Sequence, residues 1–362
     1  MSATPNDPAL AGGPDAKNSP YSKNKGNRMS IASLKRLPLL RGQETGLIGV
    51  IIAVSIAFSF VNPSFLTTDN LRNVLVAVAV VGIMAIGQCF VIISREIDLS
   101  VGSVMGLSGL CGAWLMAAGL NPWLAIVLAI GVGATAGLIT GLIVVVFRVN
   151  SFIATLGMLS VARGLTQVIS GGLPIMVDPS VMFIGQGSFL DIPTQVLIFV
   201  GLGILCQLIL TRSVVGQRIV AVGDNDEAAR LSGIPINATR IAVFVASGAL
   251  AAIAGIVYTA QVSVAEAQAG TGLELDVIAA VVIGGASLSG GRGSILGAML
   301  GAYLLGALRN AFILLELSPF LQQMSVGMVI VLAAIFDQFR QGSFRHANVM
   351  QSFLHRFRLR TR

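Results

Sequence analysis

The chain has 362 residues, of which 55% are hydrophobic and only 11% are charged, and its mean hydropathy is +0.86. A soluble protein carries about 25% charged residues, so this composition excludes an ordinary soluble globular domain. The formal net charge of +7 comes from the two ends, because all four lysines lie before residue 36 and a run of arginines closes the chain. The sequence therefore predicts an all-α polytopic membrane protein.

The N-terminal segment 1–45 is basic and rich in Pro, Gly, Ser and Asn, and its first 28 or so residues have no apolar face. Such a composition cannot bury enough apolar surface to fold, so we expect a disordered cytoplasmic tail. The first apolar run, 47–61, has no cleavage-like end and is expected to remain as an uncleaved span.

The predicted transmembrane domain covers residues 46–340. It contains ten apolar segments: 46–62, 71–93, 101–119, 122–148, 150–171, 193–211, 241–264, 274–289, 294–315 and 320–336. Two of them, 101–119 and 274–289, are short and broken by glycine, and we expect half-helices or re-entrant segments there. A helix needs about 20 apolar residues to cross a bilayer, so the sequence predicts eight to ten crossings.

Basic residues gather at the chain ends and in the polar loop 212–240, whereas the predicted outer loops carry Asp and Glu but neither Lys nor Arg. Because basic flanks mark the cytoplasmic side, we expect both termini and the loop 212–240 to be cytoplasmic. The basic tail 341–362 is then expected to lie against the lipid bilayer rather than to bind nucleic acid.

The loop 212–240 contains the stretch "GDNDEAARLSGIPINATR", which predicts a helix of about two turns. Asp224 is the expected N-cap, and Glu227 completes a capping-box arrangement. The helix continues through Ala228, Ala229 and Arg230 and ends at Gly233, since glycine suits a left-handed C-cap. So short a helix is not stable alone in water. It is either a surface linker between two spans or a docking element for a partner domain.

Polar residues near membrane depth are functional candidates because they are costly to bury in lipid. Asp98 opens the turn "DLSVGS" and either caps the next helix or orients a polar pathway. The further pathway candidates are Gln88, Ser100, Asn150 and Asp276. Amides also tie transmembrane helices together, so a structural role stays open for Gln88 and Asn150.

Glycines recur at four-residue spacing in two segments, 133–141 and 293–301, which predicts close helix packing. The stretch "IGGASLSGGRGSILG" adds a glycine-rich turn. Its candidate structural glycines are Gly284, Gly285, Gly290, Gly291, Gly293 and Gly297.

The sequence predicts no catalytic residue, no metal site and no cofactor bound by this chain. The three cysteines are isolated within apolar runs, and both histidines, His346 and His355, lie in the basic tail. A Walker A loop needs a lysine after its glycines, and no lysine follows Lys35. ATP would therefore have to be bound by another chain.

Three stretches carry a family resemblance. "EAARLSGI" (227–234) resembles the loop by which ABC transporter permeases dock into their ATPase subunits. "EIDLSVGSVMGLSG" (96–109) and "VIGGASLSGGRGSILGAMLGA" (282–302) resemble signatures of the ribose, xylose, arabinose and galactoside permeases of bacteria. The likeness runs from about residue 45 to residue 340. Two features depart from the family. Many members have small residues, often with glycine, where this chain has "REID" (95–98), and the long N-terminal segment is an addition to the family pattern.

This resemblance implies a multi-pass permease subunit of a sugar importer in the bacterial inner membrane. It also implies three partners: a periplasmic substrate-binding protein, a second permease subunit in a homodimer or heterodimer, and a cytoplasmic subunit that binds Mg-ATP. The solute is open, since a pentose, a galactoside, a polyol, a quorum-sensing signal or a nucleoside would all fit. A secondary transporter driven by an ion gradient is the alternative class, and it would need buried ionisable groups for coupling.

Overall fold

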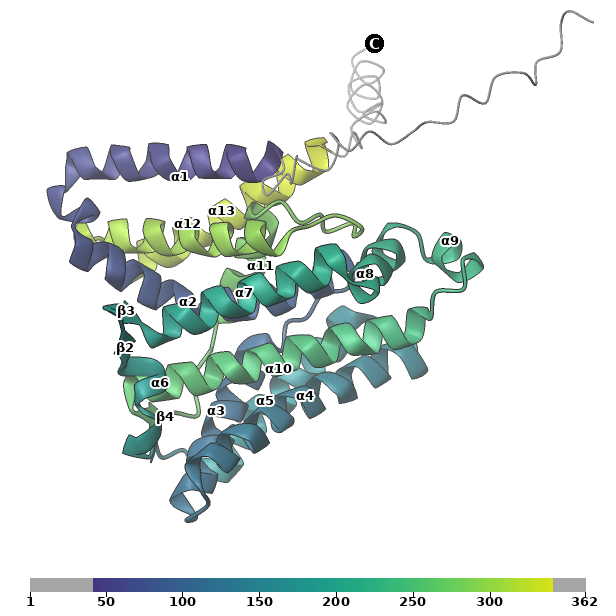
Figure 1. The fold of residues 1–362 in the computed structure, drawn as a ribbon, viewed down its shortest axis with the longest axis horizontal. Helices are drawn as coiled ribbons and strands as arrows, with labels where there is room; N and C mark the ends of the chain where they lie inside the picture. Colours follow the sequence, from purple (N-terminus) through teal and green to yellow (C-terminus); the bar gives the residue numbers. More distant parts are fainter. Residues whose placement is uncertain (1–41, 341–362) are drawn as a thin grey trace, which may run out of the picture. The chain divides into compact units, whose positions relative to one another are not determined.

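A computed structural model describes residues 42–340 of the chain (Figure 1). The predicted tail 341–362 and most of the predicted tail 1–45 lie outside the described residues. The first helix, α1, already begins at Gly42, inside the segment whose composition predicts a tail. Its first turn contains the buried Glu44, which accepts a short hydrogen bond from the hydroxyl of Ser294.

Each of the ten predicted spans contains one helix. These helices are α1 (Gly42–Val61), α2 (Thr68–Ile93), α3 (Val101–Ala117), α4 (Pro122–Val146), α5 (Ser151–Ser170), α7 (Thr194–Arg212), α10 (Ile236–Val262), α11 (Leu273–Ile283), α12 (Ile295–Leu314) and α13 (Pro319–Arg340). By length and composition, seven helices of the described part could cross a membrane: α1, α2, α4, α5, α7, α10 and α12. The predicted all-α polytopic fold is thus confirmed, and the two glycine-broken segments form the shortest of these ten helices.

Several helices begin at side-chain caps that the sequence places next to apolar runs. The side chain of Asn121 accepts hydrogen bonds from the backbone N–H groups of Trp123 (3.0 Å) and Leu124 (3.3 Å), with Pro122 at the first helical position of α4. Thr67 caps α2 in the same way. Such caps satisfy N–H groups that have no partner within the helix.

The short elements separate into two ends of the bundle. At one end lie α6 (Phe183–Gln186), the 3-10 turns Pro63–Leu66 and Pro179–Val181, and two small antiparallel ladders. One ladder pairs β1 (Ile175–Met176) with β4 (Val264–Ala265), and the other pairs β2 (Ser188–Phe189) with β3 (Ile192–Pro193). At the other end lie α8 (Val214–Asp224) and α9 (Asp226–Leu231) (Figure 1).

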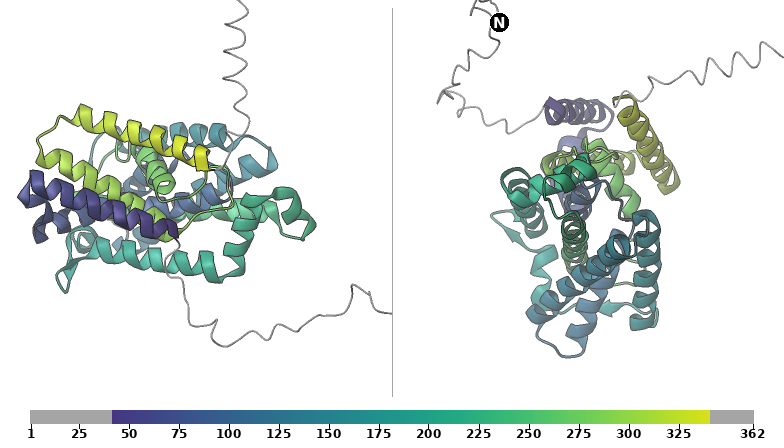
Figure 2. Two further views of the ribbon diagram at one scale, coloured as in Figure 1. Left: turned by 90° about the horizontal axis from the view of Figure 1, so that it is seen from above. Right: turned by 90° about the vertical axis from the view of Figure 1, so that its right-hand side faces the viewer.

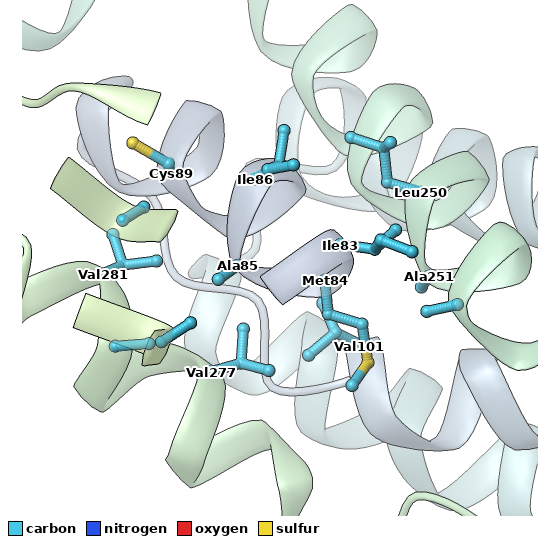
Figure 3. Close-up of a cluster of buried hydrophobic side chains, with 14 of the residues drawn as sticks. Ile83, Met84, Ala85, Ile86, Cys89, Val101, Leu250, Ala251, Val277 and Val281 are labelled. Carbon is cyan, nitrogen blue, oxygen red and sulfur yellow. The ribbon is translucent and has the colours of Figure 1, made fainter. Parts of the chain in front are cut away.

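Helix α2 is the centre of the bundle and is apolar around its whole circumference. A helix of that kind is stable only when other helices surround it. Figure 3 shows its residues Ile83, Met84 and Ile86 packed with side chains of the neighbouring helices, including Leu250 of α10 and Val277 of α11. Helices α1 and α13 lie on one side of this core and α4 and α5 on the other (Figure 2).

Helices α4 and α10 approach closely because glycines face each other across their contact. A Cβ atom on Gly137 would fall 2.8 Å from the carbonyl carbon of Phe244, and one on Gly133 would fall only 2.6 Å from the Cβ of Ala252. In lipid, close backbone approach through small residues replaces the hydrophobic force between helices. The glycine spacing in the sequence therefore marks this contact correctly.

Helix α3 begins halfway along α10 rather than at an end of the bundle. The segment 94–100 leaves the end of α2 and descends along α10, so that the carboxylate of Asp98 accepts a hydrogen bond from Ser247, near the middle of α10. From there α3 follows α10, with Gly109 packed against Gly255. The segment 94–100 is thus irregular backbone inside the bundle, which we call the inner re-entrant segment.

A second irregular segment, 266–272, enters the bundle from the opposite end. The sequence predicts an outer turn for 265–275, but only its first residue joins the small ladder with β1. The chain then turns inward until Gly270 packs against Gly102 in the first turn of α3. This close approach needs glycine on both sides. We call 266–272 the outer re-entrant segment, and α11 begins directly after it.

Candidate coupling and translocation site

The polar loop 212–240 contains two separate helices, α8 and α9, of which the sequence predicts one, and α10 begins within it at Ile236, earlier than the predicted residue 241. Helix α8 is amphipathic: Ile219 and Val222 are buried, whereas Arg218 is exposed. It begins at Ser213, whose hydroxyl accepts from the N–H of Gly216 (3.1 Å). This serine cap and the spacing of the apolar residues could have predicted α8 from the sequence.

The predicted N-cap of α9 is wrong by one residue. Asp224 is the last residue of α8, and the chain becomes extended at Asn225. The side chain of Asn225 accepts from the N–H of Ala228 at 3.0 Å and is the actual cap. Because α8 continues to residue 224, the turn between the helices is one residue later than the aspartate suggests.

Helix α9 presents most of its surface to solvent. Glu227 forms no capping box but pairs with Arg230 at 2.6 Å, and both side chains are mostly exposed. Leu231 is 80% exposed, whereas Ala229 is buried and Ala228 exposed. The helix ends at Leu231, Ser232 is its C-cap, and Gly233 follows with φ of +76°, the left-handed conformation that commonly follows a C-cap.

Three segments that lie far apart in the chain meet at the end of α8. The N–H of Gly291 donates to the carbonyl oxygen of Ile93, the last residue of α2, at 2.9 Å. Gly223 packs on the same carbonyl, and a Cβ there would also fall 2.6 Å from the nitrogen of Gly291. Gly290 and Gly291 both have positive φ, which favours glycine. We call this contact of 93, 223–224 and 290–291 the glycine junction.

The other candidate glycines join α11 to α12 and to α2. Gly284 and Gly297 lie backbone to backbone, each facing the carbonyl group of the other. Gly285 has φ of +90°, and Gly293 packs against the side chain of Ile93. All six positions thus have a packing or turn role within the described residues.

Asp98 and Ser100 are buried in the interior of the bundle, at 3% and 2% exposure. The Asp98 carboxylate accepts hydrogen bonds from the backbone N–H (2.8 Å) and hydroxyl (2.6 Å) of Ser100 and from the hydroxyl of Ser247 (3.0 Å). It therefore holds the turn before α3 and ties it to α10. Gln88, on α2, is also completely buried.

The two remaining candidates lie elsewhere. Asn150 is exposed and caps α5, accepting from the N–H of Phe152 at 2.9 Å. Asp276 lies in the first turn of α11 and pairs with Arg309 of α12 at 2.9 Å. The structure thus joins Asp98 and Ser100 in one hydrogen-bonded turn, whereas Asn150 caps α5 and Asp276 pairs with α12.

Sequence reasoning missed a group of charged residues around the start of α11. Arg163 of α5 donates from Nη1 to the carbonyl oxygens of Ala267 (2.7 Å) and Ala269 (2.8 Å) and so fixes the outer re-entrant segment. Glu274 reaches the first turn of α3 beside Gly102. Arg309 remains 43% exposed despite its ion pair. Charged residues inside apolar helices were the signal that could have found them.

Sequence reasoning also missed the ion pairs of Arg240, near the start of α10. Its Nε lies 2.9 Å from a carboxylate oxygen of Glu96, and its Nη2 lies 2.6 Å from one of Asp226.

The bundle also has an apolar groove of about 920 Å³ between α4 and α5. Its lining is hydrocarbon apart from Thr135, whose hydroxyl donates to the carbonyl of Gly131. Such a groove suits lipid chains and gives a polar solute nothing to bind. Within residues 42–340, no group of His, Cys, Asp and Glu is arranged to hold a metal ion.

The model of the family described as branched-chain amino acid transport system / permease component matches residues 70–334. The chain belongs to this family. The relationship inferred from the three motifs is confirmed, and the protein is a multi-pass membrane permease component of a transport system.

Characterised relatives in this family cover most of the chain. The ribose import permease protein RbsC of Escherichia coli (strain K12) is 40% identical over 304 residues, 83% of this chain and 94% of that protein. RbsC of Bacillus subtilis (strain 168) is 39% identical over 300 residues, 82% and 92% of the two chains. The L-arabinose ABC transporter permease protein AraH of Azospirillum brasilense is 35% identical over 307 residues, 83% and 89%. No solved structure matches the chain.

Proposed function

We propose that this permease is the membrane-spanning subunit of a binding-protein-dependent ABC importer that carries a sugar into a bacterial cell. The observation that carries the proposal is the 40% identity to a ribose import permease over 83% of the chain. The polar groups at the two re-entrant segments fit an uncharged, hydroxyl-rich solute, because serine hydroxyls and backbone groups exchange hydrogen bonds with hydroxyls.

The solute is tested by an uptake panel. Cells that express the permease with the transport proteins encoded beside its gene are given radiolabelled ribose, L-arabinose, xylose, galactose, a nucleoside and leucine in turn. We expect saturable uptake of one labelled sugar. Among the unlabelled compounds of the panel, only that same sugar should compete with it. Uptake of the nucleoside or of leucine, without uptake of any sugar, would show that the permease carries that solute and not a sugar.

The proposed docking element for the ATPase subunit is helix α9. Its well-defined ends, its exposed Leu231 and its position at the α8 end of the bundle support this role. Leu231 would give a docking partner an apolar contact among the polar side chains of α9. Because no lysine follows Lys35, Mg-ATP would be bound by that partner and not by this chain.

A matched pair of variants tests the docking role. Leu231→Asp should release the ATPase subunit during purification, whereas Leu190→Asp should retain it. Leu190 is equally exposed, at 81%, but lies at the opposite end of the bundle. Equal retention of the ATPase by both variants would contradict docking on α9.

The proposed wall of the translocation pathway is the face formed by the outer re-entrant segment, the start of α11 and Arg309. Thr271 and Gly272 are exposed there, beside the partly exposed Arg309. Irregular backbone and charged groups at membrane depth are tolerated only against protein or water. A second permease subunit, identical or different, would cover this face and enclose the pathway.

Cysteine cross-linking tests this face. Thr271→Cys should cross-link to the neighbouring subunit in native membranes, and Leu208→Cys, which is exposed on α7, should not. A cross-linked product of two identical chains indicates a homodimer, and a product with another chain indicates a heterodimer. Cross-linking through position 208 but not 271 would contradict the proposed wall.

We further propose that both termini and α8–α9 are cytoplasmic and that a periplasmic binding protein docks at the opposite end. The support is the distribution of basic residues: Arg212, Arg218, Arg230 and Arg240 lie in or beside α8–α9. The ladders at the opposite end, by contrast, are connected by loops without Lys or Arg.

A further inference from the structure

Arg240 contacts two carboxylates that belong to different parts of the chain. Glu96 lies in the inner re-entrant segment, and its side chain is only 11% exposed. Asp226 is the first residue of α9, and its side chain is 46% exposed. A guanidinium group can serve two carboxylates at once because its nitrogens form a rigid planar fork. Arg240 thus connects α9 to the inner re-entrant segment through one side chain.

The inner re-entrant segment carries this connection into the bundle. Two residues after Glu96, the Asp98 carboxylate binds Ser247 in the middle of α10, and Ser100 is the N-cap residue of α3. The N–H of Ile97 donates to the hydroxyl of Ser151 at the start of α5 (3.4 Å). A displacement of Glu96 therefore acts on α3, α5 and α10 together.

Helix α9 has a small buried surface through which to transmit force. It has six residues, and Ala229 is its buried one. Its other ion pair, between Glu227 and Arg230, is internal to the helix and does not reach the bundle. Among the described residues, the Asp226–Arg240 pair is the ion pair that ties α9 to another helix.

We propose that Arg240 is a positioning residue that couples α9 to the inner re-entrant segment, so that movement of α9 is transmitted through Glu96 to the turn before α3. This role rests on the proposed docking of the ATPase subunit on α9. In this role, the ion pairs of Arg240 with Glu96 and Asp226 transmit movement between α9 and the inner re-entrant segment, beyond any stability that they give to the fold.

Asp226→Asn is the sharpest perturbation of this link. It removes the charge that holds Arg240 to α9 but leaves the Arg240–Glu96 pair and the bundle interior unchanged. Because Asp226 is half-exposed, the variant should fold normally. Asp191→Asn is the control, since it removes an exposed carboxylate from the turn between β2 and β3, at the end of the bundle opposite α9. Arg240→Gln cuts both connections and serves as a second test.

Hydrogen exchange measured by mass spectrometry separates the two roles. The purified full-length permease is measured with and without its ATPase subunit, and with the ATPase in its ATP-bound form. In the wild type and in Asp191→Asn, we expect protection of α9 on docking and a change in exchange of residues 94–100 when ATP binds. In Asp226→Asn and Arg240→Gln, α9 should still be protected, while the change at 94–100 should be lost.

The outcomes distinguish the link from the docking itself. A full response of residues 94–100 in Asp226→Asn and Arg240→Gln would overturn the coupling role of Arg240 and leave docking on α9 intact. Loss of the response in Asp191→Asn as well would also overturn it, because the effect would then follow from a carboxylate at the opposite end of the bundle. Absence of protection of α9 in the wild type would instead overturn the docking proposal on which the link rests.

Discussion

The contact between α4 and α10 allows a quantitative test of the fold. Gly137→Ala adds one methyl group at the point where α4 meets the backbone of α10. That methyl group would lie against the carbonyl oxygen of Phe244, 2.8 Å from its carbonyl carbon and 3.0 Å from the Cα of Val245. Ordinary contact begins at 3.4 Å, and all three obstacles are backbone atoms that no rotamer change can move.

The size of the effect follows from this geometry. The two helices must separate, which would also loosen the neighbouring contact of Gly133 with Ala252. Overpacking of this kind costs about 1–3 kcal/mol. Replacing glycine by alanine within a helix returns up to about 1 kcal/mol. We therefore expect a net loss of about 1–2 kcal/mol and a midpoint of thermal unfolding lowered by about 2–3 °C.

Unfolding can be followed by a thiol-reactive dye, because Cys89 and Cys206 are buried in the native bundle. Gly131→Ala is the control on the same helix, since a Cβ at Gly131 meets nothing within 4 Å. The control should unfold at or above the wild-type temperature. An unfolding temperature for Gly137→Ala that equals that of Gly131→Ala would refute the close backbone contact of α4 and α10.

Three further predictions concern the polar segments. Asp98→Asn should fold with a stability within about 1 kcal/mol of the wild type, because asparagine can still accept hydrogen bonds from Ser100 while the Ser247 hydroxyl accepts from its amide instead of donating. Loss of the folded protein on size-exclusion chromatography would show that the charge itself is required. Gly233→Pro should abolish uptake while membrane levels on immunoblots stay normal, because proline cannot adopt the φ of +76° that ends α9; normal uptake would contradict a coupling role of α9. Ser213→Cys should react with a membrane-impermeant thiol reagent in inside-out vesicles and not in intact cells, and the reverse pattern would overturn the proposed orientation.

The long helices were predictable because each combines a continuous apolar run with a local start or stop signal. Asn121 followed by Pro122 defines the start of α4, and Gly171 in the left-handed conformation ends α5. The half-helices α3 and α11 were also predictable, since glycines interrupt their apolar runs. The sequence could not indicate how deep a polar segment lies in the bundle. Residues 266–272 are polar enough to predict an outer loop, but Arg163 binds two of their carbonyl groups and holds them inside the bundle.

The site was predictable only where its chemistry is local. Gly233 and the turn of Asp98 with Ser100 rest on contacts between residues close in sequence, and their predicted positions agree with the structure. The pairing of Arg240 with Glu96 joins residues far apart in the chain. No periodicity or capping rule links such residues, so this part of the site required the fold. The shift of the α9 cap from Asp224 to Asn225 has a similar cause, because it depends on where α8 ends.

The central claim is that this permease moves a sugar with energy from a separate ATPase. Its most direct test is uptake of the panel sugar into proteoliposomes that contain the permease and the ATPase subunit, with the binding protein added outside. We predict accumulation that requires enclosed Mg-ATP and the binding protein and is unaffected when ionophores dissipate proton and sodium gradients. Accumulation by the permease alone, driven by an ion gradient and indifferent to ATP, would contradict the claim and identify a secondary transporter.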